Sequence, residues 1–247
     1  MPLHRLFREI KEPMAHLTGE ERAAYVQDMF TRIAPRYDLM NRLMTFGQDQ
    51  RWRRILIEKA AVPAGEKVLD LGAGTGDIAL AIRGARPDVS PMAADFTFGM
   101  MAVGRQRPGG RSLPWNCADA LNLPYASSSF AAVVSGFLMR NVADLPRALG
   151  EQKRVLKPGG RIVILDTTRP PQNVFTPFIR FHLNTVIPAL GKLVTGEAEA
   201  YNYLPDTTKA FLTAETLAVR MQEAGFRDVG FRRLMFGTIA IHWGVKP

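Results

Sequence analysis

The sequence predicts an α/β fold of the doubly wound type, in which a mostly parallel seven-stranded sheet carries helical lid segments. Three observations favour this fold. Short apolar runs rich in β-branched residues alternate with helix-like segments, as a parallel sheet with crossover helices requires. A glycine-rich turn follows the first run and opens a helix. Of the 247 residues, 47% are hydrophobic, which is enough for one large buried core.

The predicted elements follow one another in a regular order. The runs that predict parallel strands are residues 67–71, 89–94, 130–135 and 161–165, with one more just before Cys117. The helices predicted between them are residues 77–83, 98–105 and 145–155. The last two strand candidates, 229–235 and 238–245, are joined by a tight turn at Gly237 and should pair antiparallel at one edge of the sheet.

The chain is predicted to form a single domain with four parts. These parts are a helical cap over residues 1–60, a core over 61–170, a lid insertion over 171–211, and a final helix with the edge strands over 212–247. Because open α/β sheets bind ligands at the carboxyl ends of their strands, we expect the cap and the insertion to shape a pocket there. The alternative is that both are additional helices that cover the core.

Composition limits the setting and the partners. A single cysteine, Cys117, cannot form a disulfide within the chain, and no stretch approaches the roughly 18 apolar residues of a membrane span. The sequence therefore predicts a cytoplasmic protein. The 4 histidines lack ligand spacing, so no metal site is expected. A net charge of +9 leaves nucleic acid and the anionic face of a membrane as partner classes, beside ordinary solvated surface.

The strongest chemical signal is the turn over residues 72–77, which reads Gly-Ala-Gly-Thr-Gly-Asp. Glycines at alternate positions indicate that the backbone approaches another group closely. The dinucleotide fingerprint G-x-G-x-x-G would need glycine where Asp77 stands. An acid at a helix N-terminus also repels a pyrophosphate. The turn therefore disfavours a nicotinamide or flavin dinucleotide.

Three carboxylates follow successive strands. Asp70, at the end of the first, would meet an ammonium group, and the bare turn leaves room for a chain that carries a sulfonium. Asp95 follows the second strand, where it would accept from ribose hydroxyls, and Asp119 follows the third, where it would accept from an adenine amino group. Together they predict S-adenosylmethionine as the cofactor. For the glycines alone, a generic strand-to-helix turn is the alternative.

Five longer segments carry a joint signature, and they are residues 37–52, 140–142, 154–168, 201–205 and 237–242. They resemble the UbiE/COQ5 family, the class I methyltransferases that C-methylate the quinol ring in menaquinone and ubiquinone biosynthesis. The resemblance implies S-adenosylmethionine-dependent C-methylation of a polyprenyl quinol. We expect demethylmenaquinol, with a 2-polyprenyl-6-methoxy-1,4-benzoquinol left open. The cofactor-binding residues that the resemblance implies are Tyr37, Asp70, Gly72, Gly74, Thr75, Gly76, Asp95, Phe96, Asp119, Ala120 and Gly136.

Two departures from the family pattern fall near the predicted site. The family usually has histidine where Asp49 stands and glycine where Leu138 stands. Asp49 inverts the sign of a charge, and Leu138 narrows the space beyond the fourth strand. Both changes bear on the fit of the substrate more than on the reaction.

Methyl transfer to an aromatic ring carbon requires few catalytic groups. Arg140, expected just past the fourth strand, would stabilise the phenolate charge that develops as a ring carbon attacks the methyl group. Proximity and exclusion of water supply the acceleration without a covalent nucleophile. The alternative for Arg140 is a surface ion pair with Asp144. Candidates for the proton acceptor are Asp38, His182 and His242, which the sequence does not rank.

A lipid-tailed substrate requires contact with a membrane surface. Residues 1–12 would form an amphipathic helix, and the insertion adds Phe178 and Phe181, so we expect peripheral docking at the inner face of the membrane. A nucleic acid methyltransferase and a non-catalytic S-adenosylmethionine-binding subunit are the competing functions. Residues 135–138 lack the Asn/Asp-Pro-Pro-aromatic turn of amino-methylating enzymes, so no nucleic acid partner is expected. The choice between a monomer and a homodimer stays open.

Overall fold

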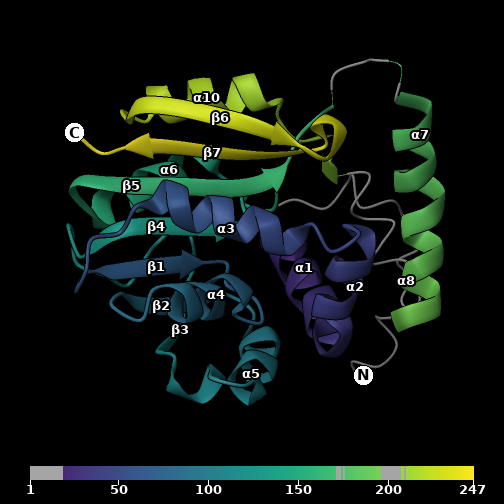
Figure 1. The fold of residues 1–247 in the computed structure, drawn as a ribbon, viewed down its shortest axis with the longest axis horizontal. Coiled ribbons are helices and arrows are strands. Elements are labelled where there is room, and N and C mark those ends of the chain that lie inside the picture. The colour runs from purple at the N-terminus through teal and green to yellow at the C-terminus, as the bar shows by residue number, and fades with distance from the viewer. Residues whose placement is uncertain (1–18, 171–173, 175, 196–206, 209) are drawn as a thin grey trace.

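The computed structural model describes residues 19–170, 174, 176–195, 207–208 and 210–247. Its centre is a seven-stranded sheet with the order β3-β2-β1-β4-β5-β7-β6 (Figure 1). The strands are β1 (Lys67–Leu71), β2 (Ser90–Asp95), β3 (Trp115–Cys117), β4 (Phe130–Gly136), β5 (Leu156–Thr167), β6 (Arg227–Leu234) and β7 (Ile239–Val245). All pairs from β3 to β5 are parallel, whereas β7 pairs antiparallel with both β5 and β6. The predicted fold class and the antiparallel edge pair are confirmed.

The strand order places a crevice in the middle of the sheet. From β1 the chain moves outward through β2 to β3 and then returns to add β4 and β5 on the other side. In such sheets the carboxyl ends of the two strands at the reversal, here β1 and β4, flank the ligand crevice. The glycine turn that follows β1 and the segment that follows β4 therefore lie at the expected place for a site.

The fifth strand is longer than the predicted residues 161–165. It begins at Leu156 because the turn at residues 157–160 is a bulge within the strand, after which pairing with β4 resumes in a shifted register. Gly159 has φ +75°, a left-handed conformation that glycine adopts at little cost. Residues 157–160, which lie between the predicted helix 145–155 and the predicted strand 161–165, therefore form a bulge within the strand.

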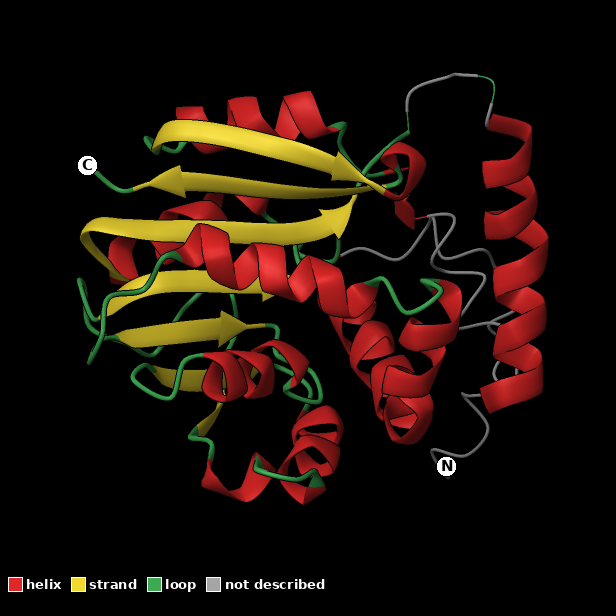
Figure 2. Ribbon diagram, viewed as in Figure 1, coloured by secondary structure: helices red, strands yellow, loops and turns green. Residues whose placement is uncertain are grey.

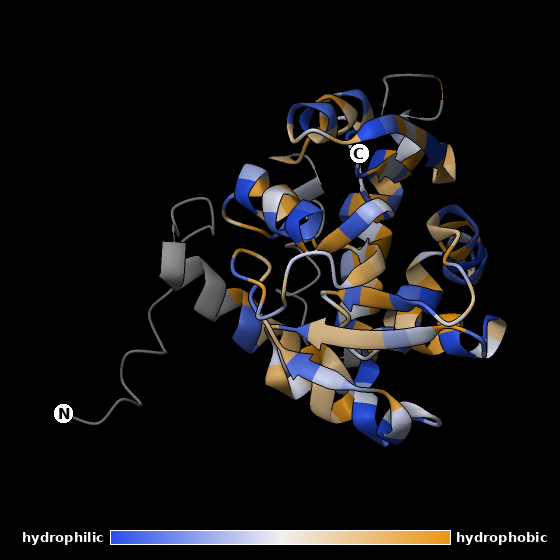
Figure 3. Cartoon of the chain, turned by 90° about the vertical axis from the view of Figure 1, so that its left-hand side faces the viewer, coloured by the Kyte–Doolittle hydropathy of each residue, from blue (hydrophilic) through white to orange (hydrophobic). Residues whose placement is uncertain are grey.

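Helices cover both faces of the sheet (Figure 2). They are α1 (Gly19–Ile33), α2 (Tyr37–Met44), α3 (Asp49–Ala60), α4 (Asp77–Ala85), α5 (Phe98–Gln106), α6 (Leu145–Val155), α7 (Thr176–Phe181), α8 (Ile187–Thr195) and α10 (Ala214–Glu223). Helices α3 and α4 share one apolar cluster with the sheet, and α6 and α10 share another. In Figure 3 these helices carry both hydrophilic and hydrophobic residues, as amphipathic helices on a sheet do.

The cap helices divide between two tasks. Trp52 and Leu56 on α3 are 1% and 0% exposed and pack against Val68 of β1, so α3 covers the sheet face. Helices α1 and α2 lie beyond the carboxyl ends of β1 and β4, where α7 and α8 of the insertion also lie (Figure 1). Helix α3 thus covers the core, as the alternative for the cap predicted, while Asp49 and Arg53 in its first turns line a cavity at the carboxyl ends of the strands.

Met40 and Ile187 join the cap to the insertion. Both are buried in one apolar cluster that is separate from the clusters on the sheet. A short π-helical segment, His182–Val186, links α7 to α8. Within the described residues, no helix is both long and apolar enough to cross a membrane. The predicted amphipathic segment 1–12 and the family-like segment 201–205 lie outside the described residues.

Candidate cofactor and substrate site

The turn after β1 leaves no room for side chains. Gly72, Gly74 and Gly76 have φ of +68°, +57° and +81°, which places all three in the left-handed region. A Cβ on Gly72 would lie 2.9 Å from Cδ1 of Leu138, and one on Gly74 would lie 3.1 Å from Cε of Met100. Only glycine fits this backbone, which is what the spacing of the motif predicts.

Asp95 ties this turn to β2. It is the last residue of the strand, and its carboxylate accepts hydrogen bonds from the backbone N–H groups of Gly74 and Thr97, each at 2.7 Å. Burial raises the pKa of the Asp95 carboxyl, while these backbone donors oppose the rise. The predicted position of Asp95 beside the glycine turn is therefore what the structure has.

The other two carboxylates lie at the ends of their strands, as predicted, and each accepts a hydrogen bond from a backbone N–H. Asp70 is the last residue but one of β1, is 0% exposed, and accepts from the N–H of Ala79 at 2.9 Å. Burial raises the pKa of Asp70 to about 7. Asp70 thus braces the start of α4 from beneath the turn, and its other carboxylate oxygen, Oδ1, has no partner among the described residues. Asp119 lies two residues beyond β3, is exposed, and accepts from the N–H of Leu121 at 2.9 Å.

A polar cavity lies against the glycine turn. It brings together five predicted site residues: Tyr37, Gly72, Gly74, Thr75 and Gly136. The remaining predicted residues, Asp70, Gly76, Asp95, Phe96, Asp119 and Ala120, are not among its lining. Five of the 11 predicted cofactor-binding residues therefore line one cavity, and the other six are not part of its lining.

The same cavity is lined by three charged residues that were not predicted to bind the cofactor. Arg53 on α3 donates from Nη2 to Asp49 Oδ2 at 2.9 Å and to Asp77 Oδ2 at 2.5 Å. Asp77 Oδ1 also pairs with Arg107 at 2.6 Å, and Arg107 reaches Asp38 at 3.0 Å. The network connects the cap to the first residue of α4. Arg53 and Asp49 are one turn apart on α3, but the other members lie far apart in sequence, so no local pattern predicts the network; the unusual Asp49 was the available signal.

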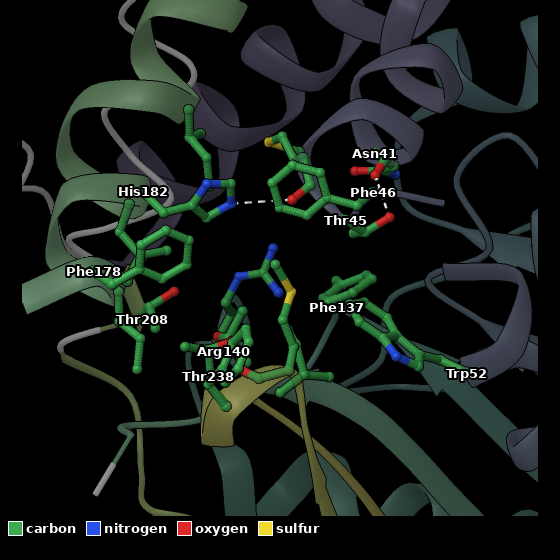
Figure 4. Close-up of a pocket in the computed structure, with 18 of the residues that line it drawn as sticks. Asn41, Thr45, Phe46, Trp52, Phe137, Arg140, Phe178, His182, Thr208 and Thr238 are labelled. Carbon is green, nitrogen blue, oxygen red and sulfur yellow. Dashed lines mark hydrogen bonds between the residues drawn. The ribbon is translucent and has the colours of Figure 1, made fainter. Parts of the chain in front are cut away.

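A second, apolar cavity adjoins the first and is open to solvent at its mouth (Figure 4). The two cavities share four lining residues: Tyr37, Asn41, Thr45 and Phe137. The phenol of Tyr37 hydrogen-bonds the Asn41 side chain, and burial raises the Tyr37 pKa. A group held in one cavity therefore meets a group held in the other at these residues.

Arg140 faces the apolar cavity from the segment that follows β4 (Figure 4). Its Nη1 donates to Asp166 Oδ1 at 2.7 Å, and its backbone N–H donates to Asp166 Oδ2 at 3.3 Å. The alternative of a surface ion pair with Asp144 is wrong, because Asp166 at the end of β5 lies directly beside Arg140. Asp144 instead caps α6 by accepting from the N–H of Arg147 at 3.0 Å.

The structure separates the three candidate proton acceptors. His182 lines the apolar cavity, with Nε2 3.1 Å from the carbonyl oxygen of Met44. His242 is 1% exposed beneath α10, with Nε2 2.9 Å from the carbonyl of Ala214, and burial lowers its pKa. Asp38 accepts from the hydroxyl of Thr75 at 2.6 Å, and burial raises its pKa. Of the three, His182 is the one that lines the cavity.

Backbone strain concentrates around the apolar cavity. Phe46, Phe137, Met235 and Phe236 line it, and all four are non-glycine residues with φ between +45° and +60°. Such conformations cost free energy and persist where the surrounding structure fixes them, most often at functional sites. No sequence signal marked these positions, because a left-handed backbone is usually predicted from glycine and none of these four residues is glycine.

Solved structures of other proteins have the same fold. The [4+2]-cyclase SpnF is similar in structure over 93% of this chain and 96% of its own, with a TM-score of 0.66 at 17% identity. Phosphoethanolamine N-methyltransferase 2 of Haemonchus contortus, in complex with S-adenosyl-L-methionine, has a TM-score of 0.60 at 14% identity over 80% of this chain and 52% of its own. At these identities the likeness shows the fold alone.

Sequence relatives are much closer. The "Ubiquinone/menaquinone biosynthesis C-methyltransferase UbiE" of Desulfotalea psychrophila is 47% identical over 90% of this chain and 90% of its own length. The "Demethylmenaquinone methyltransferase" of Thermus thermophilus is 44% identical over 89% of this chain and 100% of its own. The model of the ubiE/COQ5 methyltransferase family matches residues 17–246. The chain therefore belongs to the ubiE/COQ5 methyltransferase family.

Proposed function

We propose that this chain transfers a methyl group from S-adenosylmethionine to a ring carbon of a polyprenyl quinol in quinone biosynthesis. The observation that carries the proposal is the pair of adjoining cavities, one polar beside the glycine turn and one apolar with Arg140 on its wall. A charged cofactor suits the first and a lipid-like ring suits the second. Phe137, which lines both, marks where the two ligands meet.

The residues present fit S-adenosylmethionine. Gly72, Gly74 and Thr75 line the polar cavity, and the left-handed backbone of the two glycines brings the main chain close to a ligand there. Asp95 at the end of β2, Phe96 beside it, and Asp119 and Ala120 after β3 would hold the adenosyl group, since they lie at the carboxyl ends of strands, the edge of the sheet at which such folds bind ligands. The bound cofactor supplies a methyl group on a positively charged sulfur.

The amino acid end of the cofactor fits the charged residues of the polar cavity. Arg53 offers a guanidinium to its carboxylate, and Asp49 and Asp77 offer carboxylates to its ammonium. Asp49 is 4% exposed, so a charge there interacts strongly with another charge in the cavity. In this assignment Asp49 and Asp77 take the role that the sequence analysis gave to Asp70.

Arg140 would stabilise charge on the quinol. Removing a phenol proton would make the ring electron-rich enough for a ring carbon to accept the methyl group that the cofactor's sulfur would release. Loss of the proton on that carbon to water would restore the aromatic ring, and the phenolate oxygen would take back the first proton to give the quinol. A guanidinium fixed by Asp166 is a preorganised donor for the phenolate oxygen. The apolar lining excludes water from the cavity, which strengthens this interaction.

His182 is our proposed proton acceptor. Its Nε2 faces a carbonyl oxygen, which requires that this nitrogen carry the proton of the neutral ring. The other ring nitrogen, Nδ1, then holds the free lone pair. His182 also packs against Phe46, with 5.3 Å between ring centroids, which fixes the orientation of the imidazole at the cavity wall.

The substrate that we propose is demethylmenaquinol, with the methoxybenzoquinol as the alternative. Support comes from the Thermus thermophilus relative, whose name specifies demethylmenaquinone. The test is an anaerobic assay of both reduced quinones with a labelled methyl donor, following ring-carbon methylation by mass. Methylation of the naphthoquinol at the greater kcat/KM supports the proposal. Methylation of tRNA with steep salt dependence, or no methylation of either quinol, overturns it.

A further inference from the structure

We infer that the hydroxyl of Thr208 binds the second oxygen of the hydroquinol, while Arg140 binds the oxygen that ionises. The inference rests on the proposed function and extends it to a residue that fixes how the ring lies. Thr208 is 2% exposed and lines the apolar cavity. In Figure 4 its hydroxyl points into the cavity from the side opposite Phe137.

The Thr208 hydroxyl makes no hydrogen bond to any residue that the structure describes, although its Oγ1 is buried. A buried hydroxyl without a partner is unfavourable, so folded proteins rarely retain one unless something else binds it. Since Thr208 lines the apolar cavity, the partner that this inference assigns to it is a polar atom of the ligand.

Other polar side chains that line the apolar cavity are already satisfied. Thr45 donates to the carbonyl of Asn41 at 2.7 Å, and Thr238 donates to the carbonyl of Met235 at 2.8 Å. The side chain of Asn41 hydrogen-bonds the phenol of Tyr37. These hydrogen bonds stabilise the wall of the cavity. The Thr208 hydroxyl is different, because it makes no hydrogen bond to any residue that the structure describes.

The guanidinium of Arg140 is the donor for the other oxygen of the hydroquinol. Its Nη1 is held by Asp166, but its buried Nε has no acceptor among the residues that the structure describes. A para-hydroquinol has two oxygens on opposite sides of one ring. The ionised oxygen accepts from a guanidinium, and the other, still a hydroxyl, can both donate to and accept from threonine. The two unpartnered groups therefore match the two ends of the ring.

Two contacts on one ring fix its rotation in the cavity. With only the Arg140 contact, the ring could turn about that oxygen and present either flank to the polar cavity. A second contact at Thr208 holds one ring carbon toward Phe137, where the cavities adjoin. Thr208 would thus determine which carbon receives the methyl group as well as how tightly the quinol binds.

The test compares ligands within each variant. The probes are a short-chain prenyl naphthoquinol, kept reduced, and the two matching naphthols that each lack one hydroxyl. The variants are Thr208→Val and Thr208→Ser, and Thr31→Val on α1 is the matched control, because Thr31 donates to Gln27 within its own helix. Dissociation constants are measured in the presence of S-adenosylhomocysteine, together with the position of methylation by mass spectrometry.

We expect Thr208→Val to weaken naphthoquinol binding about 5- to 10-fold, and Thr208→Ser to restore it to within about 2-fold. One naphthol should bind all variants equally, because it lacks the hydroxyl that Thr208 contacts. Equal losses for all three ligands, or no loss for any, would overturn the inference. If the parent protein binds S-adenosylhomocysteine but neither binds nor methylates the naphthoquinol, the proposed function itself fails.

Discussion

The guanidinium of Arg140 lies 2.7 Å from the carboxylate of Asp166, and the two side chains are 6% and 1% exposed. A charge pair buried this deeply is held by geometry, since each partner would be costly without the other. The pair joins the segment after β4 to the end of β5. In the proposed mechanism, Asp166 would therefore act through the orientation that it gives to Arg140.

We expect Asp166→Asn to lower the free energy of unfolding by about 3–5 kcal/mol, because the Arg140 charge is left buried without compensation. The double variant Asp166→Asn, Arg140→Met removes both charges and should recover much of that loss. Urea denaturation measures both values. Turnover should fall about 100-fold or more in either variant, while S-adenosylhomocysteine affinity is retained. A double variant that is stable and fully active would contradict the role of Arg140.

Asp70 should make stability depend on pH. Burial raises its pKa to about 7 in the folded protein, above the unfolded value of about 3.9. The contribution of this group to stability is therefore complete below about pH 4 and is lost as the pH rises through about 7, a loss on the order of 4 kcal/mol. Asp70→Asn keeps an oxygen for the Ala79 N–H and cannot ionise, so this part of the dependence should disappear.

The measurement for Asp70 is urea denaturation at about pH 5 and about pH 8, for the parent protein and Asp70→Asn. Equal changes with pH in the two proteins would show that Asp70 does not titrate in this range. S-adenosylhomocysteine affinity provides a separate check. It should stay within about 3-fold in Asp70→Asn if Asp70 only braces the turn, since no ligand contact is lost.

Local patterns in the sequence account for the sheet and for the glycine turn. Apolar runs such as β1 (Lys67–Leu71) are buried on both faces, and the glycines after β1 need a backbone that other residues avoid. Both are properties of a few consecutive residues. Asp95 was predictable for the same reason, because it ends its strand. The resemblance to a family added Arg140, whose role could not come from its neighbours in sequence.

The rest of the site depends on contacts between distant segments. Arg53 meets Asp77 only because α3 packs across the sheet beside α4, and Thr208 faces Arg140 only because the insertion closes over β4. Pairings of this kind leave no period or spacing to detect. The partner of Arg140 illustrates the limit: Asp144 is near in sequence, but the sheet brings Asp166 closer.

Arg53 should contribute to the binding of the amino acid end of the cofactor and not to the binding of its adenosyl end. We expect Arg53→Gln to weaken S-adenosylhomocysteine binding about 10- to 100-fold, the loss of a charge-assisted hydrogen bond. Binding of 5′-methylthioadenosine, which lacks the amino acid, should change less than about 2-fold. Calorimetry of both ligands gives the ratio, with the exposed Arg54→Gln as control. Parallel losses for the two ligands would indicate a general effect on the fold.

Phe137 allows backbone strain to be separated from the function of its ring. Its φ is +60°, and its backbone is held by a hydrogen bond from its N–H to the carbonyl of Leu165 at 2.7 Å. Phe137→Gly relieves the strain and Phe137→Ala does not, so the glycine variant should be about 1 kcal/mol more stable. Both lose the ring that lines the two cavities, and turnover should fall about 100-fold in each. Urea denaturation and the methylation assay are read side by side, and restored turnover in the glycine variant would refute a role for the ring.

The lid helices should dock the protein on a membrane surface, as a substrate with a lipid tail requires. Phe181 on α7 and Leu193 on α8 are 57% and 82% exposed, although neither lines the cavity, and exposed Lys192 adds positive charge beside them. We expect the double variant Phe181→Ser, Leu193→Ser to reduce binding to vesicles with anionic lipid about 10-fold or more, because two apolar side chains no longer enter the interface.

Val219→Ser on α10, which removes an apolar side chain 48% exposed on the far side of the sheet, is the matched control. Co-sedimentation measures binding, and methylation of a long-tailed quinol in the same vesicles should fall in parallel while a short-tailed quinol in detergent is methylated as before. Equal vesicle binding by the lid variant and the control would place the docking surface elsewhere on the molecule.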